Sequence, residues 1–166
     1  LLFWVLLTGA LHLDGLADCV DAWLGGYGDK EKTLRILKEP ASGPAGISSI
    51  VLVLMVKYVA LQQLLQQSYF EVVISLVLVL VLARLSVVYL FVTSPYVKKM
   101  GLGFTISENV QKTVARNLVF GIVIGSILIG LLTGLFAVLA ASLVFWLVDK
   151  LSRERLGGFT GDVAGA

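Results

Sequence analysis

The sequence predicts an all-α protein, a polytopic transmembrane helical bundle of about five spans whose candidate site lies in cytoplasmic loops. Of its 166 residues, 58% are hydrophobic and only 14% are charged, whereas about a quarter of the residues in soluble domains are charged. The hydrophobic residues form long uninterrupted runs, and the charged residues lie between these runs. These observations indicate a chain that is solvated by lipid over most of its length.

Four apolar runs define the expected spans, because a spanning helix needs about 20 mostly apolar residues. Residues 1–11 are expected to be the end of one span. Residues 47–65 and 70–93 are two more, and the short polar connection between them favours an antiparallel helical hairpin. Residues 117–148 are too long for a single span at about 1.5 Å per residue, so we expect two helices that turn near residues 133–134.

The basic residues indicate how these spans are oriented. With this arrangement, all but two of the 13 Lys and Arg residues lie on one face of the membrane, and the two exceptions lie inside it. A single span over residues 117–148 would divide the basic residues between both faces instead. The positive-inside rule makes the basic face cytoplasmic, and we expect a multi-pass protein of the plasma membrane.

Composition also limits the domain organisation and the partners. We expect residues 1–166 to be one integral-membrane domain in a fragment that lacks N- and C-terminal spans. The start without Met inside an apolar run indicates the missing upstream stretch. The net charge of +2 and the lack of a basic arm give no reason to expect nucleic acid. Cys19 is the only cysteine, so it has no disulfide partner and no zinc-ligand spacing. The expected partner of the apolar surface is the bilayer, and a homo-oligomer is compatible with it.

Three aspartates follow the first apolar run, in HLDGLADCVDA. At about 100° per helical residue, Asp14, Asp18 and Asp21 lie within about 60° of one another. Carboxylates that close repel each other at a membrane edge unless a cation lies between them, and oxygen ligands favour a hard ion such as Mg²⁺. A helix cap explains one aspartate, but three on one face beside Gly15 predict a metal site.

A second polar stretch, RILKEPASGPAG, covers residues 35–46. One interpretation is a basic helix and turn whose cations meet anionic lipid headgroups, and it competes strongly for Arg35. For Lys38 and Glu39, which lie beside a Gly-rich bend, phosphate and metal contacts are about equally expected. Both interpretations remain open on the sequence.

A third polar stretch, RLGGFTGDVAGA, covers residues 155–166. Its glycines could let backbone amides approach a phosphate, and Asp162 adds a carboxylate for a metal. A linker would have a similar composition. This stretch is a candidate part of the site because it is expected on the same face of the membrane as the aspartates.

Four segments resemble one family: TGALHLDGLADCVDA (8–22), LRILKEPASGPAG (34–46), PYVKKMGLGF (95–104) and LGGFTGDVAGA (156–166). In this order and at about this spacing, they are similar to adenosylcobinamide-GDP ribazoletransferase, the cobalamin synthase family. The resemblance covers nearly the whole chain and is most specific in HLDGLAD and GGFTGD. It implies a polytopic membrane enzyme that requires Mg²⁺ and joins adenosylcobinamide-GDP to α-ribazole or its 5′-phosphate, releasing GMP.

Carried over to this chain, the resemblance implies metal ligands at Asp14, Asp18, Asp21 and Asp162. A carboxylate must accept the proton of the attacking hydroxyl, and Asp21, Glu39 and Asp162 are all candidates. The expected substrate-binding residues are His12, Arg35, Lys38, Lys57, Arg84, Arg155, Gly158 and Thr160.

The chain departs from the family at two positions. The family usually has Asp at position 39 and often Arg at position 41, where this chain has Glu39 and Ala41. Glu39 can still ligate a metal with a longer reach, but Ala41 cannot replace a cation. Phosphate binding by this loop would then fall to Lys38, Arg35 or Arg155.

Two cations and the only histidine lie within apolar sequence. Lys57 and Arg84 are inside the predicted spans, where a cation costs about 2.5 to 3.5 kcal/mol on insertion scales. We expect them to act as counterions of the acidic cluster, with snorkelling as the alternative for Arg84. His12 is expected to be a hydrogen-bonded, orienting residue rather than the base.

Two other functions are weighed against this one. A CDP-alcohol phosphotransferase of phospholipid synthesis would also use an Asp-rich helix, but in that class Ala17 would be followed by Arg, and here Asp18 follows. A cation transporter would use the intramembrane charges. Transporters of that kind tend to place their ion site near the midplane and to contain internal repeats, neither of which this sequence suggests.

Overall fold

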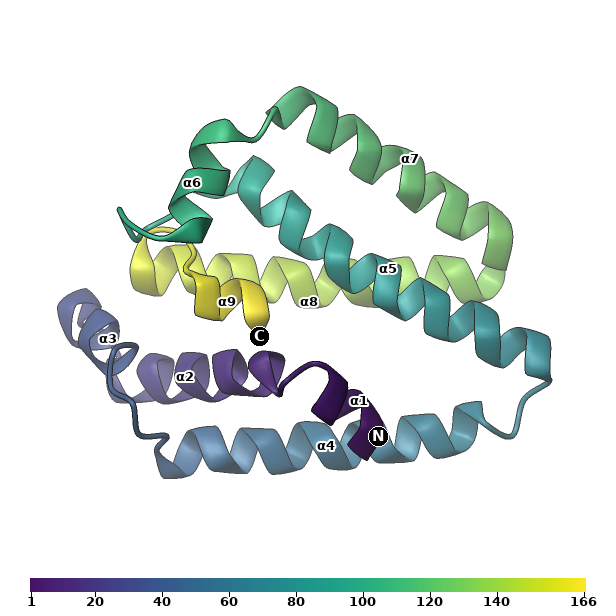
Figure 1. The fold of residues 1–166 in the computed structure, drawn as a ribbon, viewed down its shortest axis with the longest axis horizontal. Coiled ribbons are helices and arrows are strands. Elements are labelled where there is room, and N and C mark those ends of the chain that lie inside the picture. Colours follow the sequence, from purple (N-terminus) through teal and green to yellow (C-terminus); the bar gives the residue numbers. More distant parts are fainter.

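The computed structural model describes all of residues 1–166 and contains nine α-helices and no strand (Figure 1). The prediction of an all-α protein is therefore confirmed. The helices are α1 (Leu2–Leu7), α2 (Leu11–Gly25), α3 (Lys30–Ile36), α4 (Pro44–Leu64), α5 (Tyr69–Thr93), α6 (Leu102–Asn109), α7 (Lys112–Gly130), α8 (Leu132–Leu156) and α9 (Gly161–Gly165).

Four of these helices, α4, α5, α7 and α8, are long and apolar enough to cross a membrane. They contain 21, 25, 19 and 25 residues, which at 1.5 Å per residue gives about 28 to 38 Å against a hydrocarbon core of about 30 Å. Only 6% to 17% of the residues in their apolar windows are buried inside the protein. The other apolar side chains face outward, as they do in helices that lipid solvates. The chain is a membrane protein.

Residues 1–11, which were expected to be the end of a span, contain one short helix and a turn. α1 has six residues, and the chain then turns through Gly9 and Ala10, whose φ angles are 59° and 57°. α2 begins beyond this turn and packs extensively on α4 and α9. The acidic helix is therefore held against a spanning helix along its length, instead of leaving the bundle at Asp14.

The long apolar run 117–148 forms a helical hairpin, as predicted. Its turn is at Leu131, whose φ is 39°, two residues before the expected position. α7 and α8 pack against each other, and Gly134 makes this approach possible because a Cβ there would collide with the Ser126 carbonyl oxygen. The extra turn of α7 comes from polar residues before Asn117 that continue the helix back to Lys112.

The connection between α4 and α5 is short, as expected, but the two helices do not form a packed hairpin. Ser68 begins α5 with a capping box in which Glu71 is the reciprocal partner. The helices then diverge from this turn (Figure 1), because α4 packs on α2 whereas α5 packs on α7 and α8. The short loop correctly predicts that α4 and α5 run in opposite directions. The prediction that they form a hairpin is wrong with respect to their packing.

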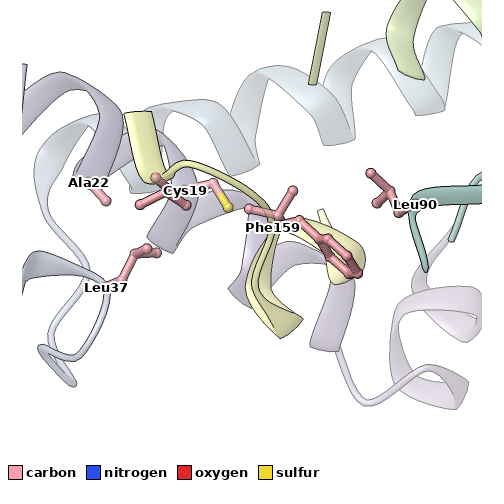
Figure 2. Close-up of a cluster of buried hydrophobic side chains, with 7 residues drawn as sticks. Cys19, Ala22, Leu37, Leu90 and Phe159 are labelled. Carbon is pink, nitrogen blue, oxygen red and sulfur yellow. The ribbon is translucent and has the colours of Figure 1, made fainter. Parts of the chain in front are cut away.

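All of the shorter helices except α1 and α2 gather at one end of the bundle, where α4 and α7 begin and α5 and α8 end (Figure 1). A buried apolar cluster holds this end together (Figure 2). Burial raises the pKa of the Cys19 thiol to about 12, so Cys19 is a neutral packing residue. The cluster consists of Cys19, Ala22, Leu37, Leu90, Leu156, Phe159 and Val163.

Candidate functional site: an acidic cluster between α2 and α9

α2 packs on the C-terminal helix, and the structure brings Asp162 of α9 close to the aspartates of α2. Burial raises the pKa of Asp18, and the charges of Asp14 and then Asp162 raise it further. Asp21 contributes in the same direction. The four carboxylates therefore share one region, although Asp162 is far from the others along the chain.

Gly15 allows α9 to lie directly on α2. A Cβ at this position would meet the Asp162 carbonyl oxygen at 2.5 Å and the Ala166 amide nitrogen at 3.2 Å. Real side chains do not approach backbone atoms that closely, so only glycine fits here. The Gly that follows Asp14 in the sequence thus sets the position of the fourth carboxylate.

Asp162 is held by two donors. The Lys98 ammonium donates to its Oδ2 at 3.0 Å, and the Thr160 hydroxyl donates to the same oxygen at 3.1 Å. Lys98 is also the only cation that opposes the rise in the pKa of Asp18. Lys98 is not among the site residues predicted from the sequence, and its one signal there is its place in the segment PYVKKMGLGF.

Backbone pairing fixes Lys98 relative to α9. The Val97 amide donates to the Phe159 carbonyl at 2.9 Å, and the Phe159 amide donates to the Pro95 carbonyl at 3.0 Å. The Phe159 ring is fully buried and packs edge-on against Phe91 and Tyr96, with centroids 4.9 and 5.2 Å apart. The segment after α5 and the segment before α9 are therefore one unit.

Gly158 and Thr160 have structural roles here, in place of the expected contacts to a phosphate. Gly158 is buried, and a Cβ there would collide with the Pro95 carbonyl oxygen. Its own carbonyl accepts a hydrogen bond from Ser152. Thr160 is fully buried and begins α9 by accepting from the Val163 amide. Neither residue is open to a ligand in this arrangement.

Asp21 connects α2 to the start of α4. Its carboxylate accepts the Gly43 amide at 2.6 Å and the Gly46 amide at 2.8 Å, so it caps a helix that begins with Pro44 and has no cap of its own. A Cβ at Gly46 would collide with this carboxylate. The Gly-Pro-Ala-Gly bend thus binds the Asp21 carboxylate through two backbone amides, and both oxygens of Asp21 already have partners.

The other predicted cations and the third candidate base are not joined to the acidic cluster by a side-chain bond. Arg35 lies in the last turn of α3, and Lys38 and Glu39 lie in the loop before α4. All three are exposed and form neither a side-chain hydrogen bond nor a salt bridge. Arg155 lies apart from the cluster, with its guanidinium 4.1 Å from the centroid of the Tyr27 ring.

Lys57 and Arg84 were expected to be counterions of the aspartates, and they form no salt bridge with any carboxylate. Burial lowers the pKa of His12, and the charges of Lys57 and then Arg84 lower it further. The Thr8 hydroxyl lies 3.3 Å from the Nδ1 of His12. Lys98 is the cation that is paired with the cluster. The expectation that His12 is oriented by a hydrogen bond agrees with the Thr8 contact.

The cluster suits a hard cation in its donor chemistry. All its ligating atoms are carboxylate oxygens, and Asp14 and Asp18 are one helical turn apart. The raised pKa of Asp18 reflects its burial first and then the negative charge of its acidic neighbours, which Lys98 only partly offsets. In the side-chain positions of this structure, no three acidic, His or Cys residues meet the geometry of a metal site, so binding an ion requires side-chain rotations.

A four-span bundle with a carboxylate-rich cluster at one end places the chain in the class of polytopic membrane proteins with a polar candidate site at one end of the bundle. The family model of cobalamin-5-phosphate synthase matches residues 1–166. The chain belongs to this family.

Curated relatives agree with this assignment. The chain is 46% identical to adenosylcobinamide-GDP ribazoletransferase of Pseudomonas entomophila (strain L48), over 100% of the chain and 67% of that protein. It is 45% identical to the protein of the same name from Pseudomonas fluorescens (strain SBW25), and 43% identical to that from strain Pf-5, in each case over 98% of the chain and 66% of the relative. The chain thus spans about two thirds of the length of these relatives. No solved structure matches it.

Proposed function

We propose that the protein is a transferase that joins adenosylcobinamide-GDP to α-ribazole or its 5′-phosphate and releases GMP. The observation that carries this proposal is the match of the whole chain to one family in which the named relatives are adenosylcobinamide-GDP ribazoletransferases. The same match favours this reaction over a CDP-alcohol phosphotransferase and over a cation transporter. The clustering of Asp14, Asp18 and Asp162 supplies a site of the required chemistry.

The cofactor we propose is Mg²⁺, with Asp14, Asp18 and Asp162 as the residues that hold it and with Asp21 beside them. A bound Mg²⁺ would supply positive charge that polarises the diphosphate and stabilises the departing phosphate. Lys98 adds a second positive charge at the same place, since its ammonium is 3.0 Å from Asp162 Oδ2. Phosphoryl transfer depends mostly on such positioning and charge stabilisation.

In the proposed step, a ribose hydroxyl of the acceptor attacks the β-phosphorus of the cobinamide diphosphate. A new phosphorus–oxygen bond forms, the bond from that phosphorus to the bridging oxygen breaks, and the electron pair leaves with GMP. We assign the hydroxyl proton to Asp162, whose Oδ2 has two donors while its Oδ1 has no partner. Asp21 is less suited as a base because both of its oxygens accept backbone amides.

We also propose that the site faces the cytoplasm across the plasma membrane. The loops and helix ends at the end of the bundle where the acidic cluster lies carry Lys30, Lys32, Lys38, Lys99 and Lys112. At the other end, the turn between α4 and α5 contains no Lys or Arg, and neither does the turn at Leu131. This asymmetry supports an inside orientation for the basic end.

A direct assay tests the function. The full-length protein would be reconstituted in lipid vesicles with Mg²⁺, adenosylcobinamide-GDP and α-ribazole, and the release of GMP would be measured. The expected result is GMP release that depends on both substrates and on Mg²⁺. GMP release without incorporation of α-ribazole, or CMP release from a CDP-alcohol under the same conditions, would contradict the proposal.

A further inference from the structure

A polar cavity lies at the same end of the bundle as the acidic cluster but outside it. It has a volume of about 360 Å³ and lies between the turn that joins α2 to α3 and the C-terminal end of α8. Its size is in the range of small-molecule sites. The side chains that give the cavity its chemistry are those of Tyr27, Lys30, Thr33, Glu154 and Arg155.

The floor of the cavity is held by buried hydrogen bonds. The Thr33 hydroxyl, which is 1% exposed, donates to the Gly26 carbonyl at 3.0 Å and to the Asp29 carbonyl at 2.7 Å. The Asp29 carboxylate is used within the turn, where it accepts the Lys32 amide at 3.0 Å and begins α3. The turn is therefore a fixed scaffold, and Asp29 is not free to bind a ligand.

Three side chains along the rim have no hydrogen-bond or salt-bridge partner within the protein. Tyr27 is 77% exposed and carries the Arg155 guanidinium 4.1 Å from its ring centroid, so a flat aromatic surface and a cation are already stacked. The carboxylate of Glu154 has no salt bridge. The ammonium of Lys30 lies against Gly157, where a Cβ would come within 2.7 Å of Nζ, and it too has no carboxylate partner.

This combination matches the chemistry of a guanine nucleotide. A purine stacks on an aromatic ring and on a guanidinium plane, guanine presents two N–H donors on one edge that suit a single carboxylate, and Lys is a common phosphate partner. The cavity also lies at a suitable distance from the acidic cluster. Gly26 follows Asp21 by five residues and Asp18 by eight, which is about 8 to 12 Å along α2 and is comparable with the length of a nucleoside.

We propose that this cavity binds the guanosine end of the nucleotide substrate, with Tyr27 and Arg155 stacking on the base, Glu154 reading its N–H edge and Lys30 meeting its phosphate. The inference rests on the proposed function, because the guanosine is that of the GDP moiety. It adds residues that select the leaving group, at a place separate from the carboxylates where the bond breaks.

Binding of GMP tests the proposal without any turnover. The full-length protein in detergent would be titrated with GMP and with AMP by calorimetry, for the native sequence and for Glu154→Gln, Tyr27→Ala and Glu31→Gln. Glu31 is an exposed carboxylate on α3 that does not line the cavity, so Glu31→Gln is the matched control. Because Glu154 and Tyr27 are exposed, their variants are expected to fold, which the thermal unfolding temperature would verify.

The expected result is that Glu154→Gln weakens GMP binding about 10- to 100-fold and removes the preference for GMP over AMP, since a bidentate base contact contributes on this scale. Tyr27→Ala would weaken binding of both nucleotides, and Glu31→Gln would leave both unchanged. Unchanged GMP binding in Glu154→Gln and Tyr27→Ala would overturn the assignment, as would an equal loss of GMP and AMP binding in Glu154→Gln. If the native protein releases GMP in the transferase assay but these variants keep full GMP affinity, only the assignment of the cavity as the guanosine site is refuted. If the native protein has no transferase activity, the proposed function is refuted.

Discussion

The Lys98 ammonium lies 3.0 Å from Asp162 Oδ2 and joins the segment that follows α5 to the C-terminal helix. Lys98 partly neutralises a group of four carboxylates. Burial and three acidic neighbours raise the pKa of Asp18, and Lys98 is the one cation that lowers it. The acidic cluster is therefore already partly compensated in the protein itself. A divalent ion would share Asp162 with this lysine.

Replacing Lys98 is expected to affect the reaction more than the fold. The side chains of Lys98 and Asp162 are 37% and 26% exposed, and partly exposed ion pairs contribute about 1 kcal/mol or less to stability. Lys98→Met should therefore lower the unfolding temperature by a few degrees at most. GMP release should fall at least 10-fold, since a positive charge beside the transferred phosphate is lost.

The neighbouring Lys99→Met is the matched control, because Lys99 is exposed and forms no salt bridge. Thermal unfolding and GMP release would be measured for both variants. Equal activity of the two variants would remove Lys98 from the site.

Asp18→Asn should stabilise the protein in the absence of divalent ions. The pKa of Asp18 is raised in the folded state, so the folded protein holds the proton more tightly than the unfolded chain does. Stability then decreases as the pH rises from about 4 through the raised value, and the loss persists at neutral pH. The uncharged Asn avoids this loss.

The pH dependence of the unfolding temperature, with and without Mg²⁺, measures this effect. The native protein should gain stability from Mg²⁺ at pH 7 because the ion binds the folded state, and Asp18→Asn should lose most of that gain. A variant that is less stable than the native protein without divalent ions, or that keeps the full gain from Mg²⁺, contradicts the role assigned to Asp18.

Asp21 and Asp14 should respond differently to substitution, although both are acidic residues of α2. Asp21 accepts two backbone amides of the α4 N-terminus, and amides left without partners cost about 1 to 3 kcal/mol. Asp21→Ala should therefore lower both the free energy of unfolding and the activity. Asp14 is exposed and its carboxylate has no hydrogen-bond or salt-bridge partner in the protein, so Asp14→Ala should lower activity while stability is unchanged or increased.

Urea unfolding in detergent, followed by circular dichroism, would be compared with GMP release for these two variants. If Asp14→Ala were as destabilised as Asp21→Ala, the distinction between a capping and a metal-binding aspartate would be wrong.

Local sequence was sufficient to predict the four spanning helices and the acidic face of α2, whereas residues 1–11 were expected to end a further span and form α1 and a turn. Hydrophobic run lengths gave the four spanning helices, and the length of residues 117–148 together with the charges on either side gave the hairpin. The common face of Asp14 and Asp18 follows from helical periodicity alone. That Asp162 lies near the aspartates of α2 was predicted from membrane topology, because the polar loops were expected to share one side of the membrane. Local sequence pattern alone does not predict it.

The partners of individual side chains could not be predicted, because they are set by contacts between distant segments. Lys98 and Asp162 are separated by 64 residues, and Asp21 and the Gly46 amide by 25. The Gly-rich composition of residues 157–161 indicated exposed amides, whereas Gly158 is a glycine because it touches the Pro95 carbonyl. A glycine required for close packing and a glycine required for ligand approach look alike in a sequence.

The last prediction tests whether α9 must lie directly on α2. Gly15→Ala places a Cβ where the Asp162 carbonyl oxygen and the Ala166 amide now lie, so α9 has to move away and carry Asp162 with it. Gly125→Ala is the matched control, since it makes the same chemical change in a helix where nothing lies within 4 Å of the new Cβ. Alanine is also the better helix former by about 1 kcal/mol.

Gly15→Ala should therefore lose at least 10-fold in GMP release and in the stabilisation by Mg²⁺, while circular dichroism reports an unchanged helix content. Gly125→Ala should keep the native activity and be equally or more stable. If Gly15→Ala were as active as Gly125→Ala, the four carboxylates would not need to meet, because a displaced α9 takes Asp162 out of reach of Asp14 and Asp18.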